Sequence, residues 1–218
     1  ENELAHGSPR PFDRDTQSRI CTLFQRTARS KLDGTGLVEI HKRVRAKLSR
    51  WRVPLFPRVR VDRMLASAGR LTSLMPPRVL AAVWRTRWNG WITQRRMQSL
   101  PGNRRRCVFA CSPAAEDSIE HYACCPRVAD WALRGLGLQQ PEGPQAKLAS
   151  FLLLHPPVAT LDDVAVAARA LRMAAVYRTH CSVAHGKVSA GRHAEQALRQ
   201  SVKELVKGHR RACQLLTH

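Results

Sequence analysis

The sequence predicts a mainly α-helical fold in which helical segments surround a small cluster of cysteine and histidine. Apolar residues recur every three or four positions, for example at Leu37, Ile40, Val44 and Leu48, as on one face of a helix. Glycine and proline separate these stretches, and no convincing β-hairpin or internal repeat is present. Four of the seven cysteines fall between positions 107 and 125. We therefore expect a helical protein with one compact site and not a disulfide scaffold.

The first half of the chain is expected to form a flexible lead at 1–12 and a basic helical region at 13–100. Asp33-Gly34 and Asn89-Gly90 end helices, Pro76-Pro77 begins one, and Thr93 caps another. The segment 58–75 has an alternative, since its first residues also fit a short strand. The helices predicted in this half are 13–32, 37–51, 58–75, 76–88 and 94–100.

The second half is expected to contain a cysteine-rich module at 101–135 and a C-terminal helical region at 146–218. A linker rich in Gln, Pro and Gly separates them. Asp162-Asp163 precedes an Ala-rich stretch and fits the N-terminus of a helix. The helices predicted in this half are 128–136, 146–154, 161–184 and 191–216.

The chain is strongly basic, with a formal net charge of +21. Most of this charge lies in the first 106 residues, which hold 24 Lys and Arg against 7 Asp and Glu, whereas the remainder holds 13 against 9. Arg outnumbers Lys by 30 to 7, and guanidinium groups bind phosphates in a bidentate manner. Nucleic acid is therefore the expected partner, ahead of an anionic membrane surface.

The sequence gives little indication of a membrane or secreted protein. No apolar run reaches the roughly 20 residues of a membrane span, and no hydrophobic signal-peptide core is present. An odd, clustered set of cysteines points to a reducing compartment. We expect an intracellular protein, in the nucleus or in a ribonucleoprotein. Because the chain begins at Glu1 and not at Met, we also expect it to be a segment of a longer protein or a processed product.

The cysteine cluster has the pattern C-x3-C-x9-H-x3-C, formed by Cys107, Cys111, His121 and Cys125. Two pairs of close-set sulfur and nitrogen ligands joined by a loop supply the tetrahedral set that zinc requires. His121 and Cys125 are four residues apart and share one face of a short helix. Cys124 is an alternative fourth ligand, but that spacing favours Cys125. With four protein ligands the zinc would be structural, because no position is left for a catalytic water.

A longer stretch resembles a known family. Met75-Pro-Pro-Arg leads into a helix with Trp84-Arg, then to Asn89-Gly90, a Thr-capped helix, the cysteine pair, and finally Glu120-His121 and Cys125-Pro126. This order is similar to the zinc-binding region downstream of reverse transcriptase in non-LTR retrotransposons, over about residues 50–135. The first cysteine pair departs from the family, which usually has C-x2-C.

The resemblance implies a zinc-containing segment that binds RNA or DNA and works beside a polymerase domain of the same polyprotein. It implies no small-molecule substrate. We expect no catalytic centre in this chain, because Asp162-Asp163 lacks the setting of a polymerase aspartate pair and fits a helix N-cap. The residues expected to contact nucleic acid flank the module or lie on the second predicted helix: Arg95, Arg96, Arg104, Arg105, Arg106 and Arg127, with Lys42, Arg43, Arg45 and Lys47.

Several alternatives stay open at this point. A zinc-containing structural protein of a ribonucleoprotein, such as an organellar ribosome, would have the same composition. A zinc-dependent nuclease would need Glu116 or Glu120 as its general base. His180, Cys181 and His185 form a weaker second metal set, for which ordinary helix-end roles are preferred. Among the tryptophans, Trp84 and Trp88 are expected in the core, while Trp91 is expected to be the most exposed.

Overall fold

The computed structural model describes residues 42, 46, 49–51, 53, 57–97 and 106–215. The chain divides into two units, Glu1–Val44 and Arg45–His218, and the helices described below belong to the second. Over the described residues the protein is mainly α-helical, as predicted, and its only β interaction is a single bridge between Arg106 and Glu116. The lead at 1–12, the helix predicted at 13–32 and most of the helix predicted at 37–51 lie outside the described residues.

Helices α3 (Pro57–Leu74) and α4 (Pro77–Arg87) follow one another across a proline break. Residues 59–61 are helical, so the helix predicted for this segment is confirmed and the strand alternative is wrong. Pro77 occupies the first turn of α4, where its missing N–H is no loss. Asn89 then takes a φ of +52° and ends the helix, as the Asn-Gly pair predicts.

The tryptophans of this region differ from expectation. Trp91 is fully buried, and its indole N–H donates to the hydroxyl of Thr86 at 2.9 Å. Trp84 and Trp88 are half-buried and lie with ring centroids 5.3 Å apart. The expectation of an exposed Trp91 is therefore wrong, because the turn at Asn89-Gly90 sends the chain back over the core. Helix α5 (Gln94–Met97) begins directly after Thr93, as predicted.

The cysteine-rich segment forms α6 (Ile119–Cys124) and α7 (Pro126–Leu136). Helix α7 ends at Gly137, whose φ of +62° closes the last turn in the left-handed conformation. Helix α8 (Pro144–Phe151) begins and ends earlier than predicted, and Leu153 beyond it has a φ of +58°. A short 3-10 turn, η1 (Val158–Thr160), leads to the longest helix.

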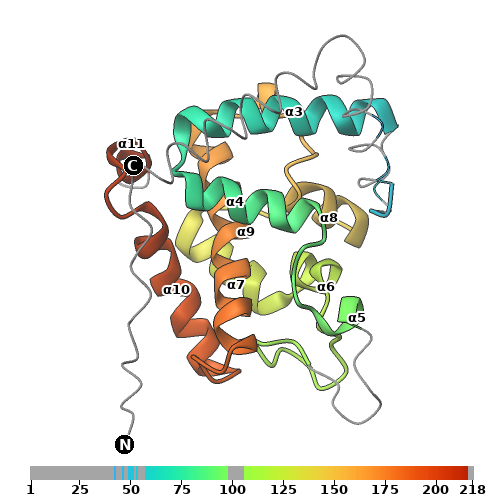
Figure 1. Cartoon of the computed structure of the whole chain (residues 1–218), viewed down its shortest axis with the longest axis vertical. Coiled ribbons are helices and arrows are strands. Elements are labelled where there is room, and N and C mark those ends of the chain that lie inside the picture. Colours follow the sequence, from blue (N-terminus) through green and yellow to red (C-terminus); the bar gives the residue numbers. More distant parts are fainter. Residues whose placement is uncertain are drawn as a thin grey trace, which may run out of the picture. The chain divides into compact units, whose positions relative to one another are not determined.

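Helix α9 (Asp163–Ala184) is the centre of the fold and contacts α3, α4, α7, α8 and α10 (Figure 1). Asp162 caps it, accepting a hydrogen bond from the amide of Ala165, so the capping role predicted for this acidic pair is confirmed. Small alanine side chains allow neighbouring helices to approach on several sides. The result is a helix buried around most of its circumference.

The C-terminal helix predicted at 191–216 is interrupted. The structure has α10 (Arg192–Val206) and α11 (Arg210–Gln214) in its place. Gly208 between them has a φ of +77°, and the side chain of His209 accepts a hydrogen bond from the amide of Ala212. A left-handed glycine followed by a new N-cap ends one helix and starts another, so the single-helix prediction is wrong.

Candidate metal centre

The first two cysteines of the cluster lie on a tight turn. The amide of Ala110 donates to the carbonyl of Cys107 at 2.9 Å, and Ala110 has a φ of +49°. The amide of Cys107 donates to the carbonyl of Ala115 at 3.1 Å, and this hydrogen bond closes the loop that follows the turn. The amide of Gly191, just before α10, donates to the carbonyl of Val108 at 2.8 Å. The turn is therefore fixed both within itself and to the C-terminal helices.

The other two members of the cluster come from α6 and its end. Ser118 caps α6 by accepting a hydrogen bond from the amide of His121 at 3.1 Å. One turn later Cys125 ends α6 and also precedes Pro126, the first residue of α7. The cap and the proline set where this short helix starts and stops. His121 and Cys125 thereby face the cysteine turn together.

The four side chains converge closely enough to hold one metal ion. The ligand atoms of Cys107, Cys111, His121 and Cys125 all lie within 4.8 Å of one another. The Cys107 and Cys125 sulfurs are 3.8 Å apart, and the Cys111 sulfur is 3.3 Å from His121 Nε2. A tetrahedral ion about 2.3 Å from sulfur and 2.1 Å from nitrogen separates its ligands by about 3.5–3.8 Å. The Cys107–Cys125 separation matches such an ion and the Cys111–His121 separation is slightly shorter; because every pair lies within 4.8 Å, small side-chain shifts would complete the tetrahedron.

The cysteines of this segment are free thiols, and the structure distinguishes the adjacent pair. Cys125 is buried in the cluster, whereas the Cys124 thiol lies 3.8 Å from the carbonyl of Pro144, outside it. This placement agrees with the i, i+4 spacing that favours Cys125. The hydrogen bond between Cys107 and Cys125 lowers the pKa of Cys125 and raises that of Cys107, to which burial also contributes. The thiolate is the form of cysteine that binds metals, so the lowered pKa of Cys125 favours metal binding.

A buried acid–base pair lies beside the cluster. His180 Nε2 is 3.0 Å from Asp117 Oδ1, and both side chains are only 1% exposed. The hydroxyl of Tyr122 donates to the same carboxylate oxygen at 2.7 Å. Burial lowers the pKa of His180, but the hydrogen bond and charge of Asp117 raise it, and the net shift is upward. The pair joins the loop before α6 to the C-terminal part of α9.

Sequence reasoning missed this pair. The sequence pattern associates His180 only with Cys181 and His185, as a weaker second metal set. In the part of the chain that the structure describes, the one group arranged to hold a metal is the Cys107–Cys125 cluster. Asp117 and His180 are 63 positions apart, so no local spacing predicts their contact. The available signal was a lone histidine on the apolar Ala-rich helix.

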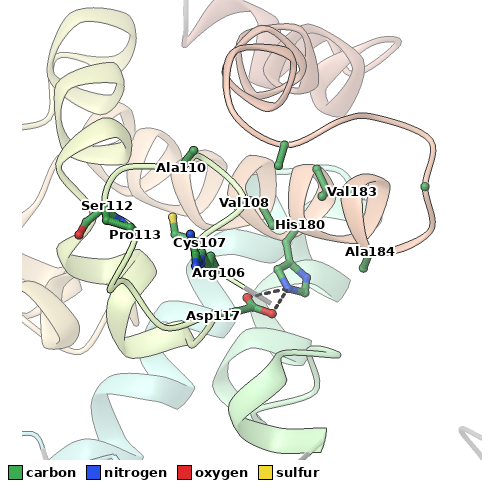
Figure 2. Close-up of a pocket in the computed structure, with 12 residues that line it drawn as sticks. Arg106, Cys107, Val108, Ala110, Ser112, Pro113, Asp117, His180, Val183 and Ala184 are labelled. Atoms are coloured by element: carbon green, nitrogen blue, oxygen red, sulfur yellow. Dashed lines mark hydrogen bonds and ion pairs between the residues drawn. The ribbon is translucent and has the colours of Figure 1, made fainter. Parts of the chain in front are cut away.

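A pocket of about 720 Å³ opens between the cysteine turn and the end of α9. Figure 2 shows Val108, Ala110 and Pro113 on one side, Val183 and Ala184 on the other, and the Asp117–His180 pair between them. The walls are apolar apart from this pair, Ser112 and the exposed Arg106. Cys107 lines this pocket, so the cysteine cluster borders a cavity large enough for a small ligand.

The expected nucleic-acid contacts are only partly described. Arg43, Arg45, Lys47, Arg104 and Arg105 lie outside the described residues. Lys42, Arg95, Arg96, Arg106 and Arg127 are described, and all are exposed.

Two of these exposed arginines have acidic partners. Arg95 lies 3.3 Å from Glu120, and Arg127 lies 3.5 Å from Glu195. Arg96 donates to the carbonyl of Trp91 and forms no ion pair with the residues that the structure describes. Arg96 and Arg106 therefore present the least compensated charge near the cluster.

Fold and cluster together define a mainly α-helical protein with a Cys₃His group that can hold a metal ion. No protein-family model matches the sequence, and the searches of curated proteins and of solved structures gave no significant match. Among the described helices, none is long and apolar enough to cross a membrane.

Proposed function

We propose that this chain is a zinc-containing, non-catalytic segment that binds RNA or DNA on behalf of a retroelement reverse transcriptase. The single observation that carries the proposal is the convergence of Cys107, Cys111, His121 and Cys125 in a chain with a net charge of +21. A compact metal centre stabilises a loop-rich surface, and the basic charge attracts phosphates to it.

Zinc is the metal that this donor set favours. Three thiolates and one imidazole form a soft, four-ligand group, which suits zinc better than magnesium, calcium or manganese, whose ligands are oxygens. All four positions come from protein side chains, so the ion would have no open position for water or substrate. The role proposed for zinc is therefore structural.

The nuclease alternative finds little support in the site. Glu120, one of its two general-base candidates, lies 3.3 Å from Arg95. The other, Glu116, is exposed on the loop and pairs with Arg106 through the backbone. A general base would have to reach a metal-bound water, and the closed ligand set provides none. We expect the purified chain neither to extend a primer nor to cut nucleic acid.

The retroelement assignment rests on the sequence resemblance from about residue 50 to 135, and the expected partner is the polymerase domain of the same polyprotein. A structural protein of a ribonucleoprotein remains the second candidate, because it would also be basic and zinc-bound. The genomic sequence upstream of Glu1 separates the two: a polymerase reading frame supports the first, and its absence supports the second.

Salt-dependent binding to an oligonucleotide tests the proposed function. Each phosphate contact lowers log K by about 0.7–0.9 per log unit of salt, so we expect a steep slope. Replacing Arg104, Arg105 and Arg106 together by Ala should weaken binding and flatten this slope while leaving the zinc content unchanged. A matched control removes three exposed charges from α10, at Arg192, Arg199 and Lys203. Wild-type protein that fails to bind contradicts the proposal. A triple variant indistinguishable from the control excludes these three arginines as contacts and moves the expected binding face to the predicted helix with Lys42, Arg43, Arg45 and Lys47.

A further inference from the structure

A second pocket, of about 390 Å³, lies between α4, α9 and the end of α10. Three arginines line it: Arg78 and Arg85 from α4 and Arg178 from α9. His185, at the end of α9, adds a fourth nitrogen-bearing side chain. No Asp or Glu is among the described residues that line the pocket. Its wall is therefore positively charged and has no built-in counterion.

Two of the arginines are held in place by neutral groups. Arg78 Nε donates to the carbonyl of Leu205 at 2.6 Å, and its Nη2 donates to the carbonyl of Lys207. Arg85 Nη1 donates to the hydroxyl of Tyr177 at 2.7 Å, with its guanidinium 5.9 Å from the centroid of that ring. Carbonyls and a phenol orient a guanidinium but leave its charge uncompensated. The remaining N–H groups stay available to a ligand.

The third arginine, Arg178, is exposed and forms no ion pair within the described ranges. Five arginines elsewhere on the described surface are ion-paired, and single exposed arginines such as Arg96 and Arg106 are not; this pocket differs because it gathers three arginines without an acidic side chain. Arg70 and Arg211 both contact Asp163, and Arg134 contacts Asp130. Other pairs are Arg95 with Glu120 and Arg127 with Glu195. Three guanidinium groups without carboxylate partners around one pocket create a local positive potential, which attracts an anionic ligand.

We propose that this pocket binds a backbone phosphate of a nucleic-acid strand. Phosphate oxygens accept several N–H donors at once, which suits guanidinium groups converging from two helices. Ile92, which is 41% exposed, and the ring of Tyr177 border the same pocket and offer apolar surface to the adjoining sugar. The pocket uses residues different from the predicted contacts and places a contact on the second half of the chain.

The test uses the full-length, zinc-loaded chain and a fluorescein-labelled single-stranded oligonucleotide. Arg85→Gln and Arg178→Gln are combined, while Arg78 is kept because it anchors the end of α10. We expect a roughly tenfold or larger loss of affinity, as for lost hydrogen bonds to a charged group. The salt slope should fall by about 0.7–0.9, the share of one phosphate. Arg192→Gln combined with Arg199→Gln removes equal charge from exposed positions of α10 and should change both values much less.

Inorganic phosphate at constant ionic strength separates the two sources of the ligand. For a backbone site, millimolar phosphate should compete weakly, and the double variant should lose oligonucleotide affinity. If the double variant binds the oligonucleotide with unchanged affinity and unchanged salt slope, the proposal is overturned. This holds even if inorganic phosphate raises the melting temperature of the wild type alone, because that result would indicate a site for free phosphate. This proposal rests on nucleic-acid binding by the chain. Wild-type protein without affinity therefore refutes the function as well, whereas an unaffected double variant refutes the pocket alone.

Discussion

The buried carboxylate of Asp117 should be among the most sensitive positions outside the cluster. It accepts hydrogen bonds from Tyr122 at 2.7 Å and His180 at 3.0 Å, with the side chains of Asp117 and His180 only 1% exposed. Asp117→Ala leaves an imidazole and a phenol without their shared acceptor. Removing one partner of a buried charged pair costs about 3–5 kcal/mol of unfolding free energy.

Asp117→Asn should cost less, because an amide oxygen can still accept from Tyr122 while the charge facing His180 is lost. We expect about 1.5–3 kcal/mol, the range for a hydrogen bond to a charged group. Urea unfolding of zinc-loaded protein, followed by tryptophan fluorescence, gives these values. Trp91 is a suitable reporter, since its ring centroid lies 5.2 Å from that of His180.

Asp130→Ala is the matched control for this pair of variants. Asp130 is 52% exposed and pairs with Arg134 one turn along α7. Surface pairs of this kind contribute about 0.5 kcal/mol. If Asp117→Ala were no more destabilising than Asp130→Ala, the Asp117–His180 pair would not be joining the metal-binding loop to α9, and the interpretation given above would be wrong.

Two further predictions concern buried cations. The pKa of His180 is higher in the folded protein than in the unfolded chain. Its pairing with Asp117 therefore stabilises the fold fully at pH values below the pKa of the unfolded state, and this stabilisation is lost as the pH rises through the pKa of the folded state. Unfolding measurements should therefore show His180→Gln costing more at about pH 6 than at about pH 9, relative to the exposed His193→Gln, and equal costs would contradict this. Arg87 is fully buried and donates to Leu152 O at 3.0 Å and to the Ser67 hydroxyl. Arg87→Met leaves these acceptors unpaired and should lower the free energy of unfolding by at least about 2 kcal/mol. A decrease as small as that caused by Arg192→Met on the surface would show that the buried Arg87 does not stabilise the fold in this way.

The local features of the fold could be predicted from the sequence because their causes are local. The breaks at Pro76-Pro77 and Asn89-Gly90 and the cap at Asp162 each depend on residues within one turn. The cluster was accessible for the same reason, since its four residues lie within 19 positions and their spacing reflects one turn and one short helix. Apart from the break before α11, periodicity placed the predicted helices of the second half to within a few residues.

The features that escaped prediction depend on distant parts of the chain. Trp91 is buried because the chain after α4 folds back onto Tyr122, Tyr177 and His180, none of which is near it in sequence. The Asp117–His180 pair has the same origin. The interruption before α11 is local, but a single Gly208 inside a periodic pattern is equally compatible with a continuous helix. Only the observed φ and the His209 cap distinguish the two.

The most direct test of the central claim is the metal content of protein purified under reducing conditions. We predict about one zinc per chain, since one four-ligand group is present. Cys125→Ser should lose the metal and Cys124→Ser should keep it, because only Cys125 lies in the cluster. Wild-type protein without zinc, or zinc lost from Cys124→Ser and retained by Cys125→Ser, would contradict the account.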